Sequence, residues 1–490
     1  MPLSAAEYRK LYDTLAELGG RADREEDVKH SGTKIILPDK MSVAQGIQYL
    51  TKYMKDQEEV SSFQHEFLCR PWDGAYNAWR AITNLTGQPT GHTIKSFFGD
   101  RPPSYITVQT SLTETAEVPW GAFNLPGLDN TVMYFQAGMH KDYGNIFQII
   151  IQAPRKYQDV INGIWKEVEK AISTNSIYRG KAFDGSQNPA FLDLSSLDPK
   201  RIVYSEEVLE QLEANLWNVI RHPEVQEKMN LKLKGAVLLY GPYGTGKSLA
   251  GMRTAQIAVE SGYAFIQVRP GKDDLTVALQ TARLYQPCVV FGEDIDIMAG
   301  ELDDGGQASQ VLDIFDGIQA KGTKIMMVLT SNHPEKLHKG MHRPGRFDIE
   351  IEIGNLDING IRTLIELSTD AMLEPDIDWV AVGEACDEYL PAFVVQVAVR
   401  AVRYALVRVD NVSEMVTIGT TDLIMAAKGL RTQFQLMQDA PEVTPQNDLE
   451  RGFMRLQKRS VAELASGHEE ADVEVWNRDA LAEVQNNHHG

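Results

Sequence analysis

The chain has very little cysteine: Cys69, Cys288 and Cys386 are the only three among 490 residues, and they lie far apart. Their spacing fits neither a zinc site nor the framework of a disulfide-rich secreted domain. Cys288 stands in an apolar, strand-like segment, which predicts a small buried side chain. Since disulfides belong to oxidising compartments, this cysteine usage favours a reducing one, and we expect a cytoplasmic protein.

Long apolar runs are also missing. No stretch approaches the roughly 18 apolar residues that a membrane-spanning helix needs, and residues 1–9 lack the apolar segment of a signal peptide. We therefore expect no membrane association. With 43% apolar and 24% charged residues, the composition is that of a soluble globular protein. The length allows about three domains.

Positive charge is in deficit, because 48 Lys and Arg residues face 68 Asp and Glu residues, for a net charge of −20. Proteins that bind duplex nucleic acid usually present a basic face that displaces the phosphate counterions. The acidic balance argues against a nucleic-acid partner, although a local basic patch stays open.

What the sequence does contain is a complete phosphate-binding motif, G-x-x-x-x-G-K-[ST]. An apolar run at 237–240 breaks into a glycine-rich turn, and a helical pattern follows at 249–259. This is the strand–loop–helix context that the motif requires. The candidate nucleotide-binding residues are Gly241, Pro242, Tyr243, Gly244, Thr245, Gly246, Lys247, Ser248 and Leu249.

Each fixed position of this motif has a chemical reason. Gly241, Gly244 and Gly246 let backbone N–H groups turn inward on a polyphosphate, and the following helix adds its positive dipole end. Lys247 is then expected to reach the β- and γ-phosphates, and the Ser248 hydroxyl to ligate Mg²⁺. The sequence therefore predicts a site for a nucleoside triphosphate with Mg²⁺.

Four regions follow from the patterns along the chain. We expect an α+β region with a helical connector at 1–190, a nucleotide-binding α/β domain at 191–355, an all-helical region at 356–438, and a polar, partly disordered tail at 439–490. In the second region, apolar runs alternate with helical patterns, which is typical of a parallel sheet covered on both faces. These runs are 236–240, 263–268, 288–291, 324–330 and 349–353.

The N-terminal region carries no catalytic motif. The expected elements are helices at 5–18 and 42–54, a β-hairpin from 132–137 and 146–151, and helices at 154–172 and 206–221. The third helix should bury one face, formed by Val160, Ile164, Val168 and Ile172. Trp72, Trp79 and Trp120 are expected in the core, because aromatic side chains are more often buried than free for binding.

Hydrolysis requires more than a phosphate-binding loop, and three further groups have suitable chemistry. Glu293 and Asp294 end an apolar strand, where carboxylates would face the nucleotide. Asn332 ends a second apolar strand. Arg343 and Arg346 flank a Pro-Gly pair, which presents two guanidinium groups suited to bidentate phosphate contacts.

The order of these motifs resembles the AAA family of AAA+ ATPases over roughly residues 200–435. The resemblance implies a P-loop α/β core with a parallel sheet, a C-terminal helical lid and a separate α+β N-terminal region. It implies that Glu293 supports Mg²⁺ together with Ser248, that Asp294 is the catalytic base, and that Asn332 positions the attacking water. Arg343 and Arg346 would reach the nucleotide of a neighbouring subunit, which requires a homo-oligomeric ring, usually a hexamer.

Two features depart from the usual AAA pattern. The acidic pair reads Glu-Asp rather than Asp-Glu, so the base is one methylene shorter, which is compatible with slow turnover. The Glu-Asp order and the Ser-Asn-His sequence at 331–333 resemble those of the mitochondrial AAA chaperones that translocate folded Rieske protein. The segment 269–275 also has no aromatic residue, and aromatic side chains are what threading unfoldases use to grip an extended chain.

The sequence thus predicts a ring-forming, chaperone-like ATPase that couples ATP binding and hydrolysis to remodelling of protein substrates held by the N-terminal region. Two alternatives remain. One is a nucleic-acid motor or loader on the same core, and the other is an ATP-binding scaffold with slow hydrolysis. Stimulation of the ATPase by DNA would favour the first alternative, and ATP binding without phosphate release would favour the second.

Overall fold

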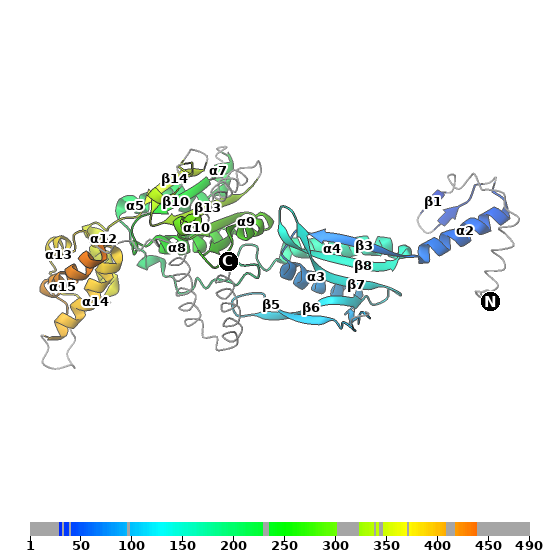
Figure 1. Cartoon of the computed structure of the whole chain (residues 1–490), viewed down its shortest axis with the longest axis horizontal. Coiled ribbons are helices and arrows are strands. Elements are labelled where there is room, and N and C mark those ends of the chain that lie inside the picture. The colour runs from blue at the N-terminus through cyan, green and yellow to red at the C-terminus, as the bar shows by residue number, and fades with distance from the viewer. Residues whose placement is uncertain are drawn as a thin grey trace, which may run out of the picture. The chain divides into compact units, whose positions relative to one another are not determined.

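The computed structural model describes residues 29–31, 34–38, 41–95, 99–228, 235–300, 323–337, 340–342, 346–369, 372–407 and 417–438 (Figure 1). The helix expected at 5–18 and the tail at 439–490 lie outside these residues. The chain separates into two compact units, Met1–Lys428 and Gly429–Gly490. Both large sheets and the phosphate-binding loop belong to the first unit.

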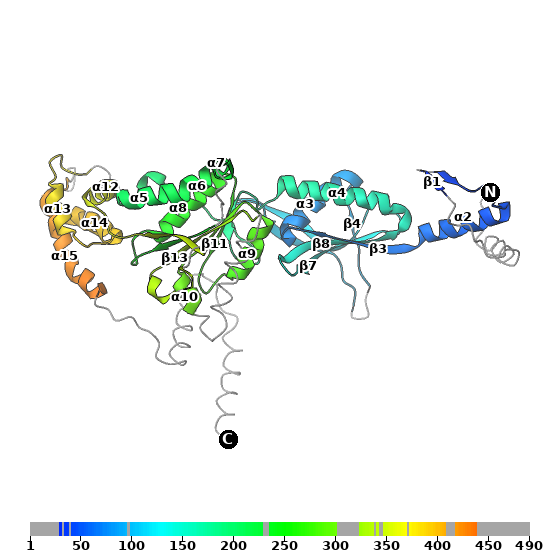
Figure 2. The same cartoon turned by 90° about the horizontal axis from the view of Figure 1, so that it is seen from above.

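The N-terminal part is built on an antiparallel sheet with the strand order β3-β8-β7-β6-β4, to which β5 adds by pairing with β6. The strands are β3 (Val60–Phe67), β4 (Thr90–Gly91), β5 (Ser104–Gln109), β6 (Thr115–Asn124), β7 (Val132–His140) and β8 (Gly144–Pro154). The predicted hairpin is confirmed as β7–β8. Helices α3 (Pro71–Thr86) and α4 (Gln158–Asn175) lie together on one face of this sheet (Figure 2).

The buried face of α4 differs in one position from the expected face. Ile164, Val168 and Ile172 are buried as predicted, but Val160 is 46% exposed. The helix begins at Gln158 after a short 3₁₀ turn, and Trp165 joins the buried side chains. A large indole shifts the centre of the apolar stripe, so the helix buries the neighbouring Ile161 and leaves Val160 at its flank.

Two smaller elements precede this sheet. Strands β1 (Lys29–Ser31) and β2 (Lys34–Ile36) form an antiparallel pair. The helix expected at 42–54 is confirmed as α2 (Val43–Glu58). Its start is fixed by a capping box, in which the Ser42 side chain accepts from the Gln45 backbone N–H and the Gln45 side chain accepts from the Ser42 backbone N–H.

The second sheet is wholly parallel, with the order β14-β10-β13-β12-β11-β9. Its strands are β9 (Ala182–Asp184), β10 (Gly235–Tyr240), β11 (Ala264–Val268), β12 (Cys288–Gly292), β13 (Ile325–Ser331) and β14 (Phe347–Glu352). All five predicted apolar runs are therefore strands. Helix α8 (Lys247–Glu260) covers one face, and α9 (Leu275–Leu284) and α10 (Ile295–Gly300) lie on the other (Figure 2). Cys288 is buried, as expected.

Strand β9 corrects one predicted boundary. It pairs with β11, so the nucleotide-binding sheet already includes residues 182–184, which the sequence had placed in the N-terminal region. A strand of three residues, Ala-Phe-Asp, has no periodicity long enough to assign it to either domain.

Residues 206–228, between β9 and β10, and the region after β14 are mainly helical. The helix expected at 206–221 is confirmed as α5 (Glu206–Leu212), a π-helical turn (Glu213–Trp217) and α6 (Asn218–Arg221), with α7 (Pro223–Lys228) after it. The region expected to be all-helical contains α12 (Ile358–Ser368), α13 (Trp379–Ala385), α14 (Pro391–Val407) and α15 (Thr420–Gln438).

A buried polar network joins the antiparallel domain to the parallel one. Arg70, which is 2% exposed, donates from Nε to Thr281 Oγ1 at 3.0 Å and from Nη1 to the Asn145 carbonyl at 3.0 Å. The Tyr285 hydroxyl accepts from the Arg70 backbone N–H at 2.8 Å and donates to Asp73 Oδ2 at 3.0 Å. Burial raises the pKa of Asp73 to about 6. Because an unpaired buried polar group is costly, this network holds α3 and α9 in one arrangement.

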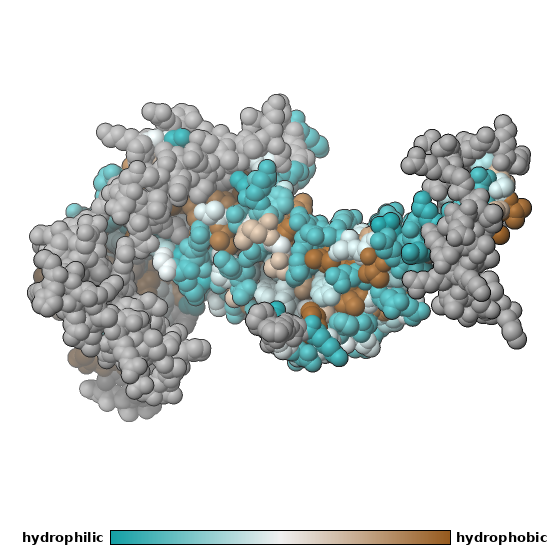
Figure 3. Space-filling view, turned by 45° about the vertical axis from the view of Figure 1, so that its right-hand side comes forward, coloured by the Kyte–Doolittle hydropathy of each residue, from teal (hydrophilic) through white to brown (hydrophobic). Residues whose placement is uncertain are grey.

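In the described part of the chain, no helix combines the length and the apolar character that crossing a bilayer requires. Figure 3 shows one face on which hydrophilic residues surround smaller apolar patches. Trp72, Trp79 and Trp120 are partly buried against the main core, which confirms the prediction that they serve packing.

Candidate functional site

The phosphate-binding loop connects the end of β10 to the start of α8, as the motif predicts. Gly241 has φ of 147°, and a Cβ at this position would lie 2.2 Å from the Ile353 carbonyl oxygen. That oxygen belongs to the backbone beyond the neighbouring strand β14 and cannot move aside. The loop therefore takes this path only with glycine at 241.

Lys247 is the charged centre of the loop. Its Nζ donates to the carbonyl oxygens of Gly241 at 2.7 Å and Pro242 at 2.6 Å, so the ammonium lies inside the curve of the loop. Burial lowers the pKa of Lys247 to about 8, while Asp294 and Asp296 act in the opposite direction. A partly desolvated ammonium at this place is suited to bind a phosphate anion.

Two contacts fasten the loop to neighbouring segments. The Tyr204 hydroxyl donates to the Gly246 carbonyl at 2.8 Å. The Ala392 backbone N–H donates to the Gly244 carbonyl at 3.2 Å, which brings the first turn of α14 against the loop. The segment between β9 and β10 and the helical region after β14 thus both touch the phosphate-binding loop directly.

Glu293 and Asp294 follow β12, but they occupy different surroundings. Glu293 Oε1 accepts from Gln267 Nε2 at 3.1 Å, beside the end of β11. Asp294 Oδ1 accepts from Asn332 Nδ2 at 2.7 Å. Burial raises the pKa of both carboxyl groups, and the nearby Asp296 raises that of Asp294 further. A carboxylate with a raised pKa is a better proton acceptor, as a general base should be.

Residues at the end of strand β13 hold Asp294 and Asp296 in place. The Asp294 backbone N–H donates to Thr330 Oγ1 at 2.9 Å, and Asp294 takes a left-handed φ of 46°. Asp296 Oδ1 accepts from Ser331 Oγ at 2.8 Å and from the Asn332 backbone N–H at 3.2 Å. Asp294 and Asn332, which were predicted separately, are therefore brought together and fixed by main-chain contacts on both sides.

The two predicted arginines differ in what the structure describes. Arg346 is half-buried, and its Nη1 donates to the Gly340 carbonyl at 3.0 Å. Arg343 lies outside the described residues. Tyr243 in the phosphate loop and His333 after Asn332 make an edge-to-face ring contact with centroids 6.2 Å apart.

Several residues of the site were not predicted. Asp296 and Thr330 lie two positions from the predicted Asp294 and Asn332 in the sequence. Gln267 is a polar residue within an apolar strand. These local features could have indicated all three residues. The contact from Tyr204 to the loop had no local sequence signal, because it joins residues 42 positions apart.

The residues present fit Mg²⁺. Among the described residues, no group of three His, Cys, Asp or Glu side chains could hold a metal by itself. Mg²⁺ is commonly bound by only one or two protein oxygens together with phosphate oxygens and water. The exposed Ser248 hydroxyl at the start of α8 and the Glu293 carboxylate supply such oxygens.

Comparison with known proteins agrees with this geometry. Residues 237–355 match the model of the AAA family, described as ATPase family associated with various cellular activities. The match runs from Val237 in β10 to just beyond β14 and therefore includes Glu293, Asp294, Asp296 and Asn332. The described core is thus an α/β P-loop fold of the AAA+ type.

Three relatives illustrate how far the similarity extends. A Cell division cycle protein 48 homolog of Archaeoglobus fulgidus is 30% identical over 40% of this chain and 29% of its own length. A Proteasome-activating nucleotidase of Methanococcus maripaludis is 26% identical over 49% of this chain and 63% of its own. The Peroxisomal ATPase PEX6 of Pichia angusta is 30% identical over 40% of this chain and 18% of its own. The chain spans less than two thirds of the length of each.

Proposed function

We propose that this chain is an ATPase that uses ATP binding and hydrolysis to remodel protein substrates or complexes. The observation that carries the proposal is the pairing of Asp294 with Asn332 at the ends of β12 and β13, beside the phosphate loop that holds Lys247. The similarity to ATPases of the AAA family supports it.

In the proposed mechanism, the loop amides and Lys247 hold the phosphates of ATP. Ser248 and Glu293 would hold Mg²⁺, which would supply positive charge to the phosphate oxygens when bound. Asp294 accepts a proton from the attacking water. Asn332 fixes the direction of the Asp294 carboxylate through its 2.7 Å hydrogen bond and offers its amide to the same water. The raised pKa of Asp294 favours proton uptake, and the shorter side chain requires a close approach of the water.

The assembly and the partners are part of this proposal. We place Arg343 and Arg346 at the nucleotide of a neighbouring subunit in a homo-oligomeric ring of six, and a protein substrate on the N-terminal region. We assign the protein to the cytoplasm. We also propose that the core is related, within the AAA family, to the chaperones that translocate folded Rieske protein; the Glu-Asp order supports this.

Steady-state phosphate release tests the proposal most directly. We expect the specific activity of the wild-type chain with ATP and Mg²⁺ to rise with protein concentration, because each site would need a neighbouring subunit. Asp294→Asn should bind ATP normally and lose about a hundredfold or more of the activity. Asp376→Asn, an exposed acid outside the site, is the matched control.

The same experiment separates the alternatives. Tight ATP binding with no release from the wild type would assign a scaffold. Release that Asp294→Asn leaves unchanged would refute the assignment of the base, and activity independent of concentration would refute a shared site. Stimulation by single-stranded or duplex DNA that falls steeply with salt would favour the nucleic-acid motor.

A further inference from the structure

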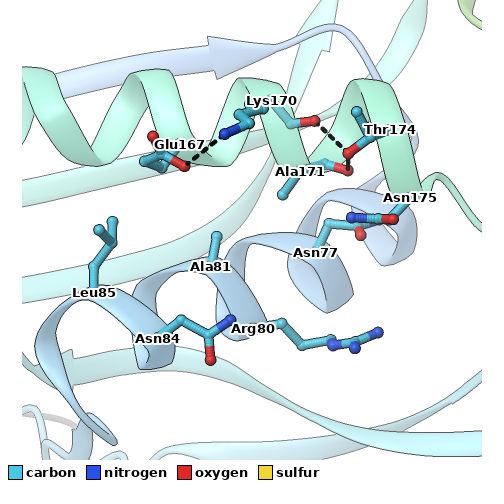
Figure 4. Close-up of a pocket in the computed structure, with 10 residues that line it drawn as sticks. All are labelled: Asn77, Arg80, Ala81, Asn84, Leu85, Glu167, Lys170, Ala171, Thr174 and Asn175. Carbon is cyan, nitrogen blue, oxygen red and sulfur yellow. Dashed lines mark hydrogen bonds and ion pairs between the residues drawn. The ribbon is translucent and has the colours of Figure 1, made fainter.

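The N-terminal domain has a groove between α3 and α4 that the proposed ATPase chemistry does not use (Figure 4). Its volume is about 250 Å³, and five residues of each helix line it. Asn77 and Asn175 lie at one end, and Leu85 and Glu167 lie at the other. Seven of its ten lining residues have polar side chains.

Asn77 is the buried polar residue of this groove, with only 2% of its surface exposed. Its Nδ2 donates to the Asp73 carbonyl oxygen at 3.0 Å and to Asp73 Oδ1 at 2.8 Å. Both partners are acceptors, so the nitrogen must face Asp73 and the oxygen must face the groove. Among the described residues, Asn77 Oδ1 has no hydrogen-bond donor, and it is not fully buried, so solvent or a ligand in the groove can donate to it.

Two further amides line the groove on its rim. The side chains of Asn84 on α3 and Asn175 on α4 form no hydrogen bond to another residue in the described ranges, and both are exposed. A carboxamide carries a donor and an acceptor side by side, which is the complement of a peptide group. Ala81 and Ala171 also line the groove, and their small side chains leave room for a backbone to approach.

The charged residues of the groove are already paired within the protein. Lys170 Nζ lies 3.8 Å from Glu167 Oε2. Arg80 Nη1 donates to the Tyr76 hydroxyl at 2.9 Å, and its guanidinium lies over the Tyr76 ring. Glu167 offsets the charge of Lys170, but the Tyr76 hydroxyl is neutral and leaves Arg80 its positive charge. The choice of a peptide over an anion therefore rests on the amide groups, and phosphate is a competitor in the test below.

The spacing of the amides matches an extended chain. Asn77 and Asn84 are seven residues apart on α3, or about 10 Å along the helix axis at 1.5 Å per residue. An extended chain covers that distance with about three residues. Alternate peptide groups of one such segment could therefore meet the amide groups in turn, while the exposed Leu85 offers an apolar contact for a side chain.

We propose that the α3–α4 groove binds the main chain of an extended polypeptide segment, with Asn77 Oδ1 accepting a peptide N–H and with Asn84 and Asn175 each pairing with a peptide group. This proposal rests on the function proposed above, since it assigns the substrate site of a protein remodeller. Recognition through the main chain tolerates many sequences, as a remodelling protein requires.

The groove also adjoins the network that joins the two domains. Asp73, the partner of Asn77, accepts from Ser176 Oγ at 2.7 Å and from the Tyr285 hydroxyl at 3.0 Å. Ser176 directly follows Asn175. A ligand in the groove would therefore contact two residues that adjoin the hydrogen bonds to α9 of the ATPase core.

Fluorescence anisotropy with the full chain tests the proposal. The probe is a fluorescein-labelled peptide of three Ala-Leu-Ser repeats, and its partner is the same peptide with every second backbone nitrogen methylated. We expect the first peptide to bind and the methylated peptide to bind at least tenfold more weakly. The double variant Asn84→Ala with Asn175→Ala should lose about the same factor. Asn162→Ala, an exposed asparagine of α4 outside the groove, should match the wild type.

The contrary outcomes are distinct. Absence of binding, equal binding of the methylated peptide, or full binding by the double variant would each overturn the proposal. Inorganic phosphate that binds and displaces the peptide would assign an anion site instead. The assay needs no nucleotide, so phosphate release measured beside it separates the two ideas. Normal phosphate release without peptide binding would refute only the proposed peptide site. Peptide binding without phosphate release would refute only the proposed ATPase activity.

Discussion

The two sheet domains use buried polar residues in different ways. In the parallel domain, Asp294, Asp296 and Asn332 gather where neighbouring strands end, so one edge of the sheet collects groups from distant parts of the sequence. In the antiparallel domain, Asn77 and Asp73 lie on α3, which covers the sheet, and the buried Gln148 lies along β8 rather than at a strand end. The comparison shows that a parallel sheet brings polar side chains together at the ends of its strands. An antiparallel sheet with helices on one face instead places them between helices and at the contact with the next domain.

The first test of this contrast removes the positive charge of Lys247 from the phosphate-binding loop of the parallel domain. We expect Lys247→Ala to weaken ATP binding by about a thousandfold, or about 4 kcal/mol, because it removes the only ammonium inside the loop. Binding of a fluorescent ATP analogue measures it. Lys272→Ala, an exposed lysine of the same domain, should bind as the wild type does. If Lys247→Ala bound ATP with near-normal affinity, the loop would not be the ATP-binding site.

A second test weakens the junction between the two domains. Arg70→Ala removes the donor to the Asn145 carbonyl and the Thr281 hydroxyl and one of two donors to the Val277 carbonyl, so we expect a loss of about 3 kcal/mol in the free energy of unfolding. Hydrogen exchange should show that α3 and α9 lose protection together. Arg362→Ala, which removes an exposed i,i+4 pair with Glu366, should change stability by less than about 0.5 kcal/mol. Loss of protection in α3 alone would mean that the network does not couple the domains.

A third test separates binding from turnover at the parallel edge. Asn332→Ala frees the Asp294 carboxylate from its 2.7 Å partner, and we expect kcat to fall about tenfold to a hundredfold with little change in ATP affinity. Stopped-flow phosphate release and equilibrium binding measure the two effects. Asn359→Ala, an exposed residue of α12, is the control. An equal loss of affinity and turnover would show that Asn332 acts in binding rather than in positioning the base.

The smallest expected effect is a pH dependence. Since burial lowers the pKa of Lys247 to about 8, the free protein must take up a proton to bind ATP above that pH. The affinity should be constant below pH 8 and fall by about tenfold per pH unit above it, until the pKa of the bound form is reached. Lys247→Arg keeps its charge throughout, so any ATP binding that it retains should be flat over this range. A wild-type profile that is flat to pH 9.5 would contradict the lowered pKa.

The contrast between the domains also explains what the sequence could predict. The five parallel strands, the phosphate loop and the polar residues Asp294 and Asn332 at strand ends follow local rules, since apolar runs mark strands and polar residues often follow them. The hydrogen bond between Asp294 and Asn332 was not predicted. Asn77 and Arg70 carry no such mark. Their roles depend on contacts with Asp73, Tyr285 and Thr281, some of which lie more than two hundred positions away. Strand β9 was missed for the same reason, because its pairing with β11 defines it more than its three residues do.

Strand β9 also decides where the chain can be cut. It closes one edge of the parallel sheet, so a fragment that starts at residue 191 would leave β11 with a row of unpaired N–H and C=O groups. Open edges of this kind pair with other chains and promote aggregation. An ATPase fragment meant to stay monodisperse should therefore begin before Ala182. Even then, Tyr285 would lose its Asp73 partner, so the two domains are better treated as one folding unit than as exchangeable modules.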